Sequence, residues 1–399
     1  MVPSHSRIHI HELPFTQMDF YTYVAAPEFG VGHENPRVQF LGIVATCITK
    51  LVLPCAAQVE TIAKTSNICV CSSLAKPLMF ALSEKFETPL VMVNLQPLTP
   101  TEQIPHYSNT DAFIEAITGD DNGDKTEKHM NSYIDLEEHS FNFLKPSMDK
   151  LCEDICVENT DRLESFEEWK LCISGRDPTK RVHVAECFSN AVIPKVADVG
   201  SLVHPIGPLA DSYIPPDFEP PADLVSFLDD CEEAPVCIGY GSMPFDKLSL
   251  ILSALEEAQA KAILVGDALK IGEGTEFTKT NIFQIGNIPY PWLLPKCSMM
   301  FCHGGAGVMN ACLRAGIPAI ISPLMGDQFV HAKLLAAEGL GAQAATMATL
   351  TQEDIVQGIA AGLACREAAK RLGEKIRSGN QKNPVDDMAS LVMSIADRD

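Results

Sequence analysis

A glycine-rich turn is the segment best suited to bind a ligand. Residues 302–307 read Cys-His-Gly-Gly-Ala-Gly and lie between an apolar run typical of a strand and an amphipathic run typical of a helix. Three glycines and an alanine let the backbone turn tightly and bring its N–H groups close to a ligand, while the following helix points its positive end the same way. This chemistry suits a phosphate or diphosphate, and His303 could donate to the same oxygens. The alternative is an ordinary glycine-rich turn with a structural histidine.

Two common nucleotide-binding patterns do not fit this turn. No Lys-Ser/Thr pair follows the glycines, so the segment is not a Walker loop, and its spacing is not that of the dinucleotide fingerprint. A second turn, Gly-Tyr-Gly-Ser-Met-Pro at 239–244, also fails that fingerprint because Pro244 replaces the third glycine.

Hydrophobic patterns in the second half of the chain predict an α/β fold. Strands are expected at 236–238, 262–265, 282–285, 299–302 and 319–321, and helices at 248–258, 309–315, 330–338 and 353–363. Such alternation indicates βαβ units in a parallel sheet covered on both faces. A sheet of this kind binds ligands beyond the carboxyl ends of its strands.

The first half carries the same pattern more weakly. Strands are expected at 7–11, 68–71, 90–93 and 182–185, and residues 111–168 are expected to be mainly helical. Prolines recur from Pro205 to Pro221, which disfavours a helix or central strand and predicts an extended surface segment. We therefore expect two Rossmann-like, doubly wound domains facing each other across a cleft. Their predicted bounds are 1–200 and 234–380, with a linker at 201–233 and a last helix within 381–399 that could return to the first domain.

Composition and charge narrow the classes of partner. The 399 residues include 52 Asp and Glu against 30 Lys and Arg, a net charge of −22. That balance disfavours nucleic acid and anionic membrane surfaces as partners, because both require a basic face. Fourteen cysteines without a Cys-x-x-Cys pair indicate free thiols and a cytoplasmic location. Lys50 interrupts the best candidate for a membrane span, so at most transient membrane contact is expected.

Several segments together resemble the donor-binding signature of UDP-sugar glycosyltransferases. They are 285–295 (Ile-Gly-Asn-Ile-Pro-Tyr-Pro-Trp-Leu-Leu-Pro), the turn at 302–307, and 323–329 (Pro-Leu-Met-Gly-Asp-Gln-Phe). The variant is similar to that of the sterol 3-β-glucosyltransferase branch, whose Gly-Phe-Gly-Ser-Met-Pro turn resembles residues 239–244. Weaker similarity extends from about residue 68 to the last residues.

This resemblance implies a GT-B fold with a UDP-sugar held mainly by the second domain. The diphosphate would be contacted by residues 241–242 and by His303 with the amides of 305–307, and the uracil edge by the backbone at Ile288. Asp327 and Gln328 would accept and donate hydrogen bonds to sugar hydroxyls. The implied donor-binding residues are Gly241, Ser242, Ile288, His303, Gly305, Ala306, Gly307, Val308, Asp327 and Gln328.

The implied reaction moves a hexose, with glucose expected first, from a UDP-sugar to a hydroxyl of a lipophilic acceptor such as a sterol, with inversion. Preorganised N–H dipoles could stabilise the departing UDP by about 3 kcal/mol each, so neither a metal nor a cofactor beyond the UDP-sugar is expected. The single Asp-x-Asp pair lies at 397–399, in the last residues of the sequence.

The sequence departs from the family pattern at several positions. Val308 replaces a threonine, Tyr290 and Pro291 replace a histidine and an aspartate, and Cys302 replaces a first histidine. The family's opening strand and Gly-rich loop, which position the acceptor-activating base, are not found before Arg7, so the first domain is expected to be incomplete. The catalytic residues therefore stay unknown.

Three other side chains have weaker claims to the site. His106 could line the acceptor side of the cleft, His331 is expected on a helix surface, and Trp292 is expected to anchor the core. Two alternative functions stay open: a UDP-sugar-binding homologue that is truncated or catalytically impaired, and another GT-B enzyme such as a nucleotide-sugar epimerase or a phosphorylase. The sequence fixes neither the donor sugar nor the acceptor.

Overall fold

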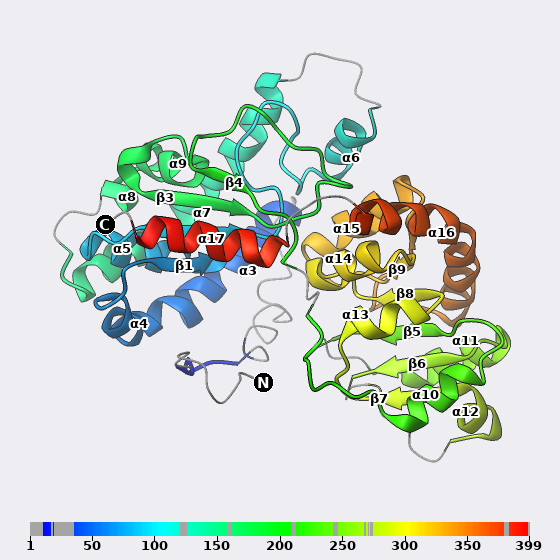
Figure 1. Ribbon diagram of the computed structural model, residues 1–399. Helices are drawn as coiled ribbons and strands as arrows, with labels where there is room; N and C mark the ends of the chain where they lie inside the picture. The colour runs from blue at the N-terminus through cyan, green and yellow to red at the C-terminus, as the bar shows by residue number, and fades with distance from the viewer. Residues whose placement is uncertain are drawn as a thin grey trace.

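The protein forms two α/β lobes, each built on one parallel sheet (Figure 1). The computed structural model describes residues 11–16, 19, 36–119, 126–157, 161–209, 213–241, 246–266, 269, 271, 274–378 and 383–397. Within them the first sheet has the order β1-β2-β3-β4 and the second β10-β9-β8-β5-β6-β7. The predicted α/β class is confirmed.

The first lobe packs its helices around four short strands. The strands are β1 Cys69–Ser72, β2 Leu90–Asn94, β3 Val182–Glu186 and β4 Val203–Pro205, and the helices are α3 Pro36–Cys47, α4 Ala56–Ala63, α5 Lys76–Lys85, α6 Thr110–Thr118, α7 Thr126–Asp154, α8 Asp161–Glu164 and α9 Phe166–Ser174. A π turn at Ile48–Val52 and 3-10 turns at Leu53–Cys55, Ser73–Ala75 and Pro178–Lys180 complete it. The strands expected at 68–71, 90–93 and 182–185 fall on β1, β2 and β3, whereas most of the one expected at 7–11 lies outside the described residues.

The second lobe contains every strand expected for it. Its strands are β5 Val236–Gly239, β6 Ala262–Val265, β7 Ile282–Ile285, β8 Met299–Cys302, β9 Ala319–Ile321 and β10 Gly341–Gln343. The helices are α10 Ala222–Asp229, α11 Leu248–Glu257, α12 Glu276–Asn281, α13 Tyr290–Leu293, α14 Ala306–Ala315, α15 Asp327–Ala337 and α16 Gln352–Ser378, with a 3-10 turn at Leu294–Lys296. The last helix of the chain is α17 Pro384–Ala396. The helix expected at 353–363 continues to residue 378.

The strand order of the second lobe reverses once, between β5 and β8. From β5 the chain adds β6 and β7 on one side, then returns to add β8, β9 and β10 on the other. Every residue of β5, β6, β8 and β9 is buried, as in a sheet covered on both faces. In such a sheet a ligand-binding crevice forms where the order reverses, which here is at the carboxyl ends of β5 and β8.

The segment expected to be an extended linker contains regular structure. β4 pairs with β3 and ends at Pro205, which an edge strand tolerates. Helix α10 begins directly after Pro221 and buries Leu224 completely. The described residues between Pro205 and Pro221 form no helix, as the prolines predict. Helix α10 lies within the expected linker bounds of 201–233 but beyond the last of these prolines, and a proline just before a helix removes no intrahelical hydrogen bond.

The last helix lies on the first lobe. Figure 1 shows α17, in red, across the lobe that holds β1 and β3. Ile395 of α17 belongs to a buried cluster with Val91 of β2 and with Ala185 and Cys187 at the end of β3. The chain thus crosses between the lobes twice.

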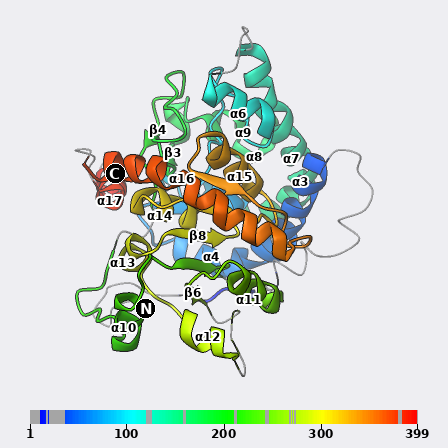
Figure 2. The same ribbon diagram turned by 90° about the vertical axis from the view of Figure 1, so that its right-hand side faces the viewer.

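The two lobes also meet directly through α6 and α15 (Figure 2). Phe113 of α6 is fully buried and shares one hydrophobic cluster with Val330 and Leu334 of α15. Lys333 adds an ion pair with Asp111 at 2.7 Å. Apolar packing therefore sets the position of one lobe against the other.

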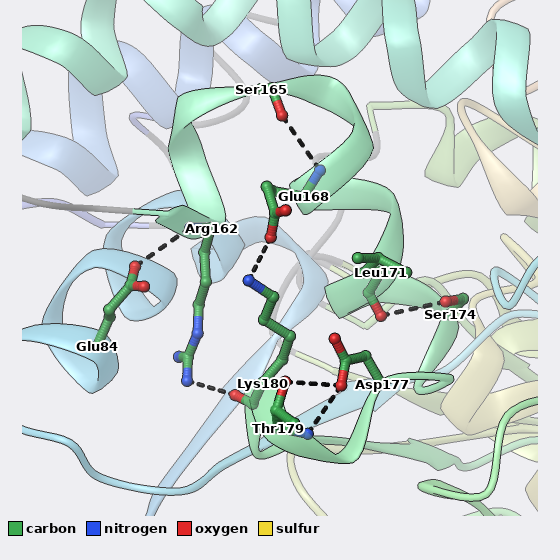
Figure 3. Close-up of polar contacts among 9 residues, drawn as sticks. All are labelled: Glu84, Arg162, Ser165, Glu168, Leu171, Ser174, Asp177, Thr179 and Lys180. Atoms are coloured by element: carbon green, nitrogen blue, oxygen red, sulfur yellow. Dashed lines mark hydrogen bonds and ion pairs between the residues drawn. The ribbon is translucent and has the colours of Figure 1, made fainter.

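A buried arginine joins the helices of the first lobe to its sheet (Figure 3). The Arg162 guanidinium donates to the Ser83 hydroxyl in α5 and to the carbonyl of Lys180, which lies just before β3. The Arg162 backbone N–H donates to the Glu84 carboxylate, and the Lys180 ammonium pairs with Glu168 of α9. Buried polar groups of this kind stabilise a fold only while every partner is present.

One apolar helical run overlaps the candidate membrane span that Lys50 interrupts. Residues 42–63 form a 22-residue run with a mean hydropathy of 1.6, long and apolar enough by those two measures to cross a membrane despite Lys50. A third of its most apolar window is buried, and Ala45, Ile48 and Leu53 join the core of the first lobe. Core helices of folded domains reach the same length and mean hydropathy.

Candidate functional site

The turns that follow β5 and β8 lie against each other and require glycine. Gly241 has a φ of +60°, and a Cβ there would lie 3.6 Å from Cε1 of His303. Gly304 has a φ of +85°, and a Cβ there would clash with Ile321 at 2.4 Å. A Cβ on Gly305 would lie 2.7 Å from Nε2 of His303. The two turns predicted to share a ligand are thus neighbours.

The glycine-rich turn ends in the open N-terminus of α14. Gly305 is the N-cap residue and supplies no side-chain cap. The amides of Ala306, Gly307 and Val308 lie in the first turn of the helix, where no intrahelical carbonyl is available to them. Together with the helix dipole they form an anion-binding end. Val308 points its apolar side chain into the second lobe's core instead of adding a hydroxyl.

His303 stands beside these amides as a neutral donor. Burial lowers the pKa of His303 below its ordinary value, and His331 adds to this effect while the Asp327 carboxylate opposes it. Its Nδ1 is buried and has no hydrogen-bond partner among the described residues. Ser242, predicted to touch the same group, lies outside the described residues. A neutral imidazole can donate one N–H to a phosphate oxygen.

His331 was missed as a site residue. It is 4% exposed, and its Nδ1 lies 2.8 Å from the carbonyl oxygen of Gly304. Because a carbonyl only accepts, Nδ1 carries the proton and donates. The expectation of a helix-surface histidine is wrong because α15 is buried on most of its faces, including Gln328, Val330 and Leu334. His331 thereby holds the glycine-rich turn in place.

Asp327 and Gln328 open α15 at the border between the lobes. Oδ2 of Asp327 accepts a hydrogen bond of 2.6 Å from Nε2 of Gln96, which belongs to the first lobe. Oε1 of Gln328 accepts the N–H groups of Leu324 and Met325 at 2.7 and 3.1 Å. The Gln328 oxygen is therefore engaged by the backbone, which leaves the amide nitrogen as the group of this side chain that can donate to a ligand.

The remaining predicted positions lie around the same crevice. Ile288 lies in the loop between β7 and α13, where its half-buried side chain joins the second lobe's core. Cys302 is fully buried, and burial raises the pKa of its thiol to about 12. The Tyr290 hydroxyl lies 3.1 Å from where a Cβ of Gly239 would stand. Cys302 and Tyr290, two of the departures from the family pattern, thus fill the core.

A cavity of about 380 Å³ lies where the first lobe meets Asp327. Its first-lobe wall comes from the segments that follow β1 and β2 and from α3, α5 and α7, and its second-lobe wall is residues 325–328. A larger hollow of about 570 Å³ opens at the other end of the second sheet, beside Ser298 and Pro318. We place the site at the smaller cavity because parallel sheets bind ligands at the carboxyl ends of their strands.

His106, which the sequence placed on the acceptor side of the cleft as a prediction, lines this cavity. Its Nδ1 accepts the Ser108 backbone N–H at 3.1 Å. The same nitrogen lies 2.9 Å from the Ser108 hydroxyl oxygen, so Ser108 orients the imidazole ring.

The comparisons with known proteins agree with this geometry. Residues 249–388 match the family described as "Erythromycin biosynthesis protein CIII-like, C-terminal domain". Over 176 residues the chain is 31% identical to Sterol 3-beta-glucosyltransferase UGT80B1 of Arabidopsis thaliana, which covers 43% of this chain and 28% of that protein. It is also 31% identical over 182 residues to the Sterol 3-beta-glucosyltransferase of Komagataella phaffii, covering 43% of this chain and 15% of that protein. The resemblance stated from the sequence is confirmed.

These matches span less than a third of the relatives' own length. Solved structures cover more of the chain. Spinosyn Rhamnosyltransferase SpnG complexed with thymidine diphosphate aligns with a TM-score of 0.58 at 17% identity, over 92% of this chain and 84% of that one. CalG4, the Calicheamicin Glycosyltransferase, aligns with a TM-score of 0.58 at 15% identity, over 96% and 85%. The GT-B fold implied by the resemblance is thereby confirmed.

Proposed function

We propose that this protein transfers a hexose from a UDP-sugar to a hydroxyl of a lipophilic acceptor, with inversion and without a metal. Glucose is the first candidate for the hexose. The observation that carries the proposal is the position of Asp327. Its carboxylate lies between the glycine-rich turn of one lobe and an apolar cavity walled mainly by the other. The printed names of the sterol glucosyltransferase relatives support the same class of reaction.

The donor half of the proposal rests on the anion-binding end of α14. When the bond to the sugar breaks, negative charge grows on the diphosphate, and amides already aimed at it need not reorganise. Each such donor can contribute about 3 kcal/mol to transition-state stabilisation. His303 adds a neutral N–H, which does not form a permanent ion pair with the product and so favours UDP release.

The acceptor half rests on the size and lining of the cavity. A volume of about 380 Å³ lies within the range of about 300–1,000 Å³ for small-molecule sites. Side chains such as Val44, Leu98 and Leu144 make its wall mainly apolar. A hydroxyl on a lipophilic skeleton in this cavity would reach the border where Asp327 stands, so the acceptor and the donor sugar would meet there.

The test is titration calorimetry with UDP, followed by turnover of UDP-glucose with a panel of lipophilic alcohols. We expect UDP binding, transfer that persists in EDTA, and an inverted anomeric configuration in the product by NMR. UDP binding with no transfer to any hydroxyl would instead support the catalytically impaired homologue.

Two glycine-to-alanine substitutions, one at the proposed donor site and one away from it, provide the control for this test. Gly305→Ala places a Cβ 2.7 Å from Nε2 of His303, so we expect weaker UDP binding. Gly42→Ala introduces the same methyl group in α3 with nothing within 4 Å, so UDP binding should be unchanged. Equal UDP affinity in the two variants would contradict the proposed donor site.

We also propose a cytoplasmic location with at most transient membrane contact. All fourteen cysteines are free, which supports a reducing compartment, and the net charge of −22 opposes lasting attachment to anionic lipid. Cell fractionation after a high-salt wash tests this, and recovery of the protein in the washed membrane fraction would refute it.

A further inference from the structure

An ion pair faces the cavity between the lobes. Nζ of Lys76 lies 3.0 Å from Oε1 and 3.1 Å from Oε2 of Glu137, and the two side chains are 13% and 10% exposed. Lys76 begins α5, Glu137 lies within α7, and both line the cavity. The Trp169 indole N–H donates to the same carboxylate at 3.0 Å. Any molecule that fills the cavity therefore meets a charged pair.

The Glu137 carboxylate is held in its charged form in a wall that is otherwise mainly apolar. Burial would raise the pKa of Glu137, but the Lys76 ammonium and the hydrogen bonds from Trp169 and Lys76 together hold the pKa of Glu137 below its ordinary value, with a smaller contribution from His106. The surrounding wall includes Val44, Ile48, Val93, Leu98, Leu136 and Leu144. A plain hydrocarbon in this cavity would remove water from the pair and return no hydrogen bond, which is costly for buried charges.

Lys76 retains hydrogen-bonding capacity. An ammonium has three N–H donors, and Glu137, with two oxygens, is the single hydrogen-bond partner that the described residues give it. The Trp169 ring, 5.3 Å from Nζ, adds a cation–π contact that uses no particular N–H. Arg162 differs, because its guanidinium is enclosed by Ser83 and the Lys180 carbonyl and does not line the cavity. At least one N–H of Lys76 is thus available to a ligand.

Charge balance selects the kind of group that this N–H binds. Glu137 already neutralises Lys76, so a ligand carboxylate would place a second anion beside Glu137 in a chain of net charge −22. An uncharged oxygen accepts the same hydrogen bond without that repulsion. The hydrogen bond from a charged donor is also stronger than one between two neutral groups.

We propose that the acceptor carries, besides the hydroxyl that receives the sugar, a second uncharged oxygen, a ketone or a hydroxyl, which accepts a hydrogen bond from Lys76. This inference rests on the proposed glycosyl transfer. Asp327 and Lys76 line one cavity from opposite lobes, so a single acceptor can contact both. The acceptor class is then an oxygenated hydrophobic skeleton and not a hydrocarbon with one hydroxyl.

The test compares two probes that differ by one oxygen: the hydroxysteroid epiandrosterone and its analogue that lacks the ketone. Binding is followed through Trp169, which lines the cavity, in a Trp292→Phe background that removes the chain's second tryptophan. We expect the ketone to improve both affinity and kcat/KM by about tenfold or more, the effect of one charged hydrogen bond. Because binding is read without turnover, the inference and the proposed function can fail separately.

The decisive variant replaces both members of the pair. In Lys76→Met with Glu137→Gln no carboxylate is left buried and unpaired, and the glutamine oxygen can still accept the Trp169 N–H. We expect the preference for the ketone to shrink to within about twofold. Lys76→Arg keeps a charged donor and should keep a preference. Lys85→Met is the matched control, because Lys85 lies on the same helix, pairs with Glu60 and does not line the cavity.

The outcomes separate the two claims. If the protein binds the ketone steroid more tightly but transfers sugar to neither steroid, the inference is supported and the proposed function is refuted. The inference is overturned if the wild-type protein binds both steroids equally or binds neither. A preference for the ketone that survives in the double variant also overturns it.

Discussion

Replacement of His331 by leucine tests whether one buried hydrogen bond holds the glycine-rich turn. Leucine matches the histidine ring in approximate bulk but cannot donate to the Gly304 carbonyl, which lies 2.8 Å from Nδ1. Because His331 is only 4% exposed, water cannot replace its N–H as the donor unless α15 repacks. A buried carbonyl left without its partner costs about 1–3 kcal/mol.

This cost divides between folding and ligand binding. If the whole cost appears when UDP requires the ordered turn, a loss of 1–3 kcal/mol corresponds to roughly 5- to 150-fold weaker UDP binding, since 1.4 kcal/mol is tenfold. If it appears in the free protein, urea denaturation reports the same loss in the free energy of unfolding. Calorimetry with UDP and urea denaturation on the same variant therefore measure the two parts of this cost. We expect both the UDP affinity and the free energy of unfolding to fall.

A matched control exists in the first lobe. Nδ1 of His139 lies 2.6 Å from the Asp135 carbonyl, but His139 is exposed on α7. Water replaces that bond, so His139→Leu should change the free energy of unfolding by less than about 0.5 kcal/mol and leave UDP affinity unchanged. His331→Gln, which restores an N–H donor, should recover part of the affinity. A folded His331→Leu protein that binds UDP as tightly as the wild type would refute the positioning role.

Further predictions concern the donor site, the contact between the lobes and the buried arginine. Gly305→Ala should weaken UDP binding about tenfold or more in calorimetry, because the new Cβ would displace His303 from the amides. Gln96→Ala frees the Asp327 carboxylate, so affinity for UDP-glucose should rise a few-fold relative to UDP, and a fall would mean that Gln96 helps to bind the sugar. Arg162→Met should lower the free energy of unfolding by about 3 kcal/mol in urea without altering UDP affinity, and a loss under about 1 kcal/mol would contradict the network. Burial lowers the pKa of His303 in the folded protein, so the unfolded chain binds a proton at this histidine more readily. The contribution of His303 to the free energy of unfolding should be complete above about pH 6.5 and should be lost as the pH falls from there through the lowered pKa of the folded protein. His303→Gln should remove that part of the pH dependence of stability.

The second lobe was the more predictable part of the fold because its signals are local. Strands β5 to β9 are short runs of mainly apolar residues, with Gln284 of β7 as the polar exception, and each was placed within one residue. Strand β10 was missed because Gly341–Gln343 has no such run and depends on pairing with β9. Helix α10 was missed because the prolines before it indicate an extended chain, whereas Pro221 starts the helix.

The candidate site divides in the same way. The glycine-rich turn and the start of α14 could be predicted because their geometry follows from consecutive residues. Gln96 and Asp327 are 231 residues apart, and Lys76 and Glu137 are 61 apart, so no sequence pattern links them. The one available signal for His331 was its spacing from Gln328, which puts both residues on one face of α15. That signal was overlooked because this face of the helix was expected to be exposed.

Helix α15 explains how distant residues are kept in register. Its first residue, Asp327, contacts Gln96, its fifth, His331, holds the Gly304 carbonyl, and the helix packs against α6 of the other lobe. Because a helix of this length moves as a unit, a displacement of α6 would shift the Asp327 carboxylate and the glycine-rich turn together. Under the proposed function, the same apolar packing that joins the lobes sets the distance between the proposed acceptor cavity and the proposed donor site, and transfer between two bound substrates depends on that distance.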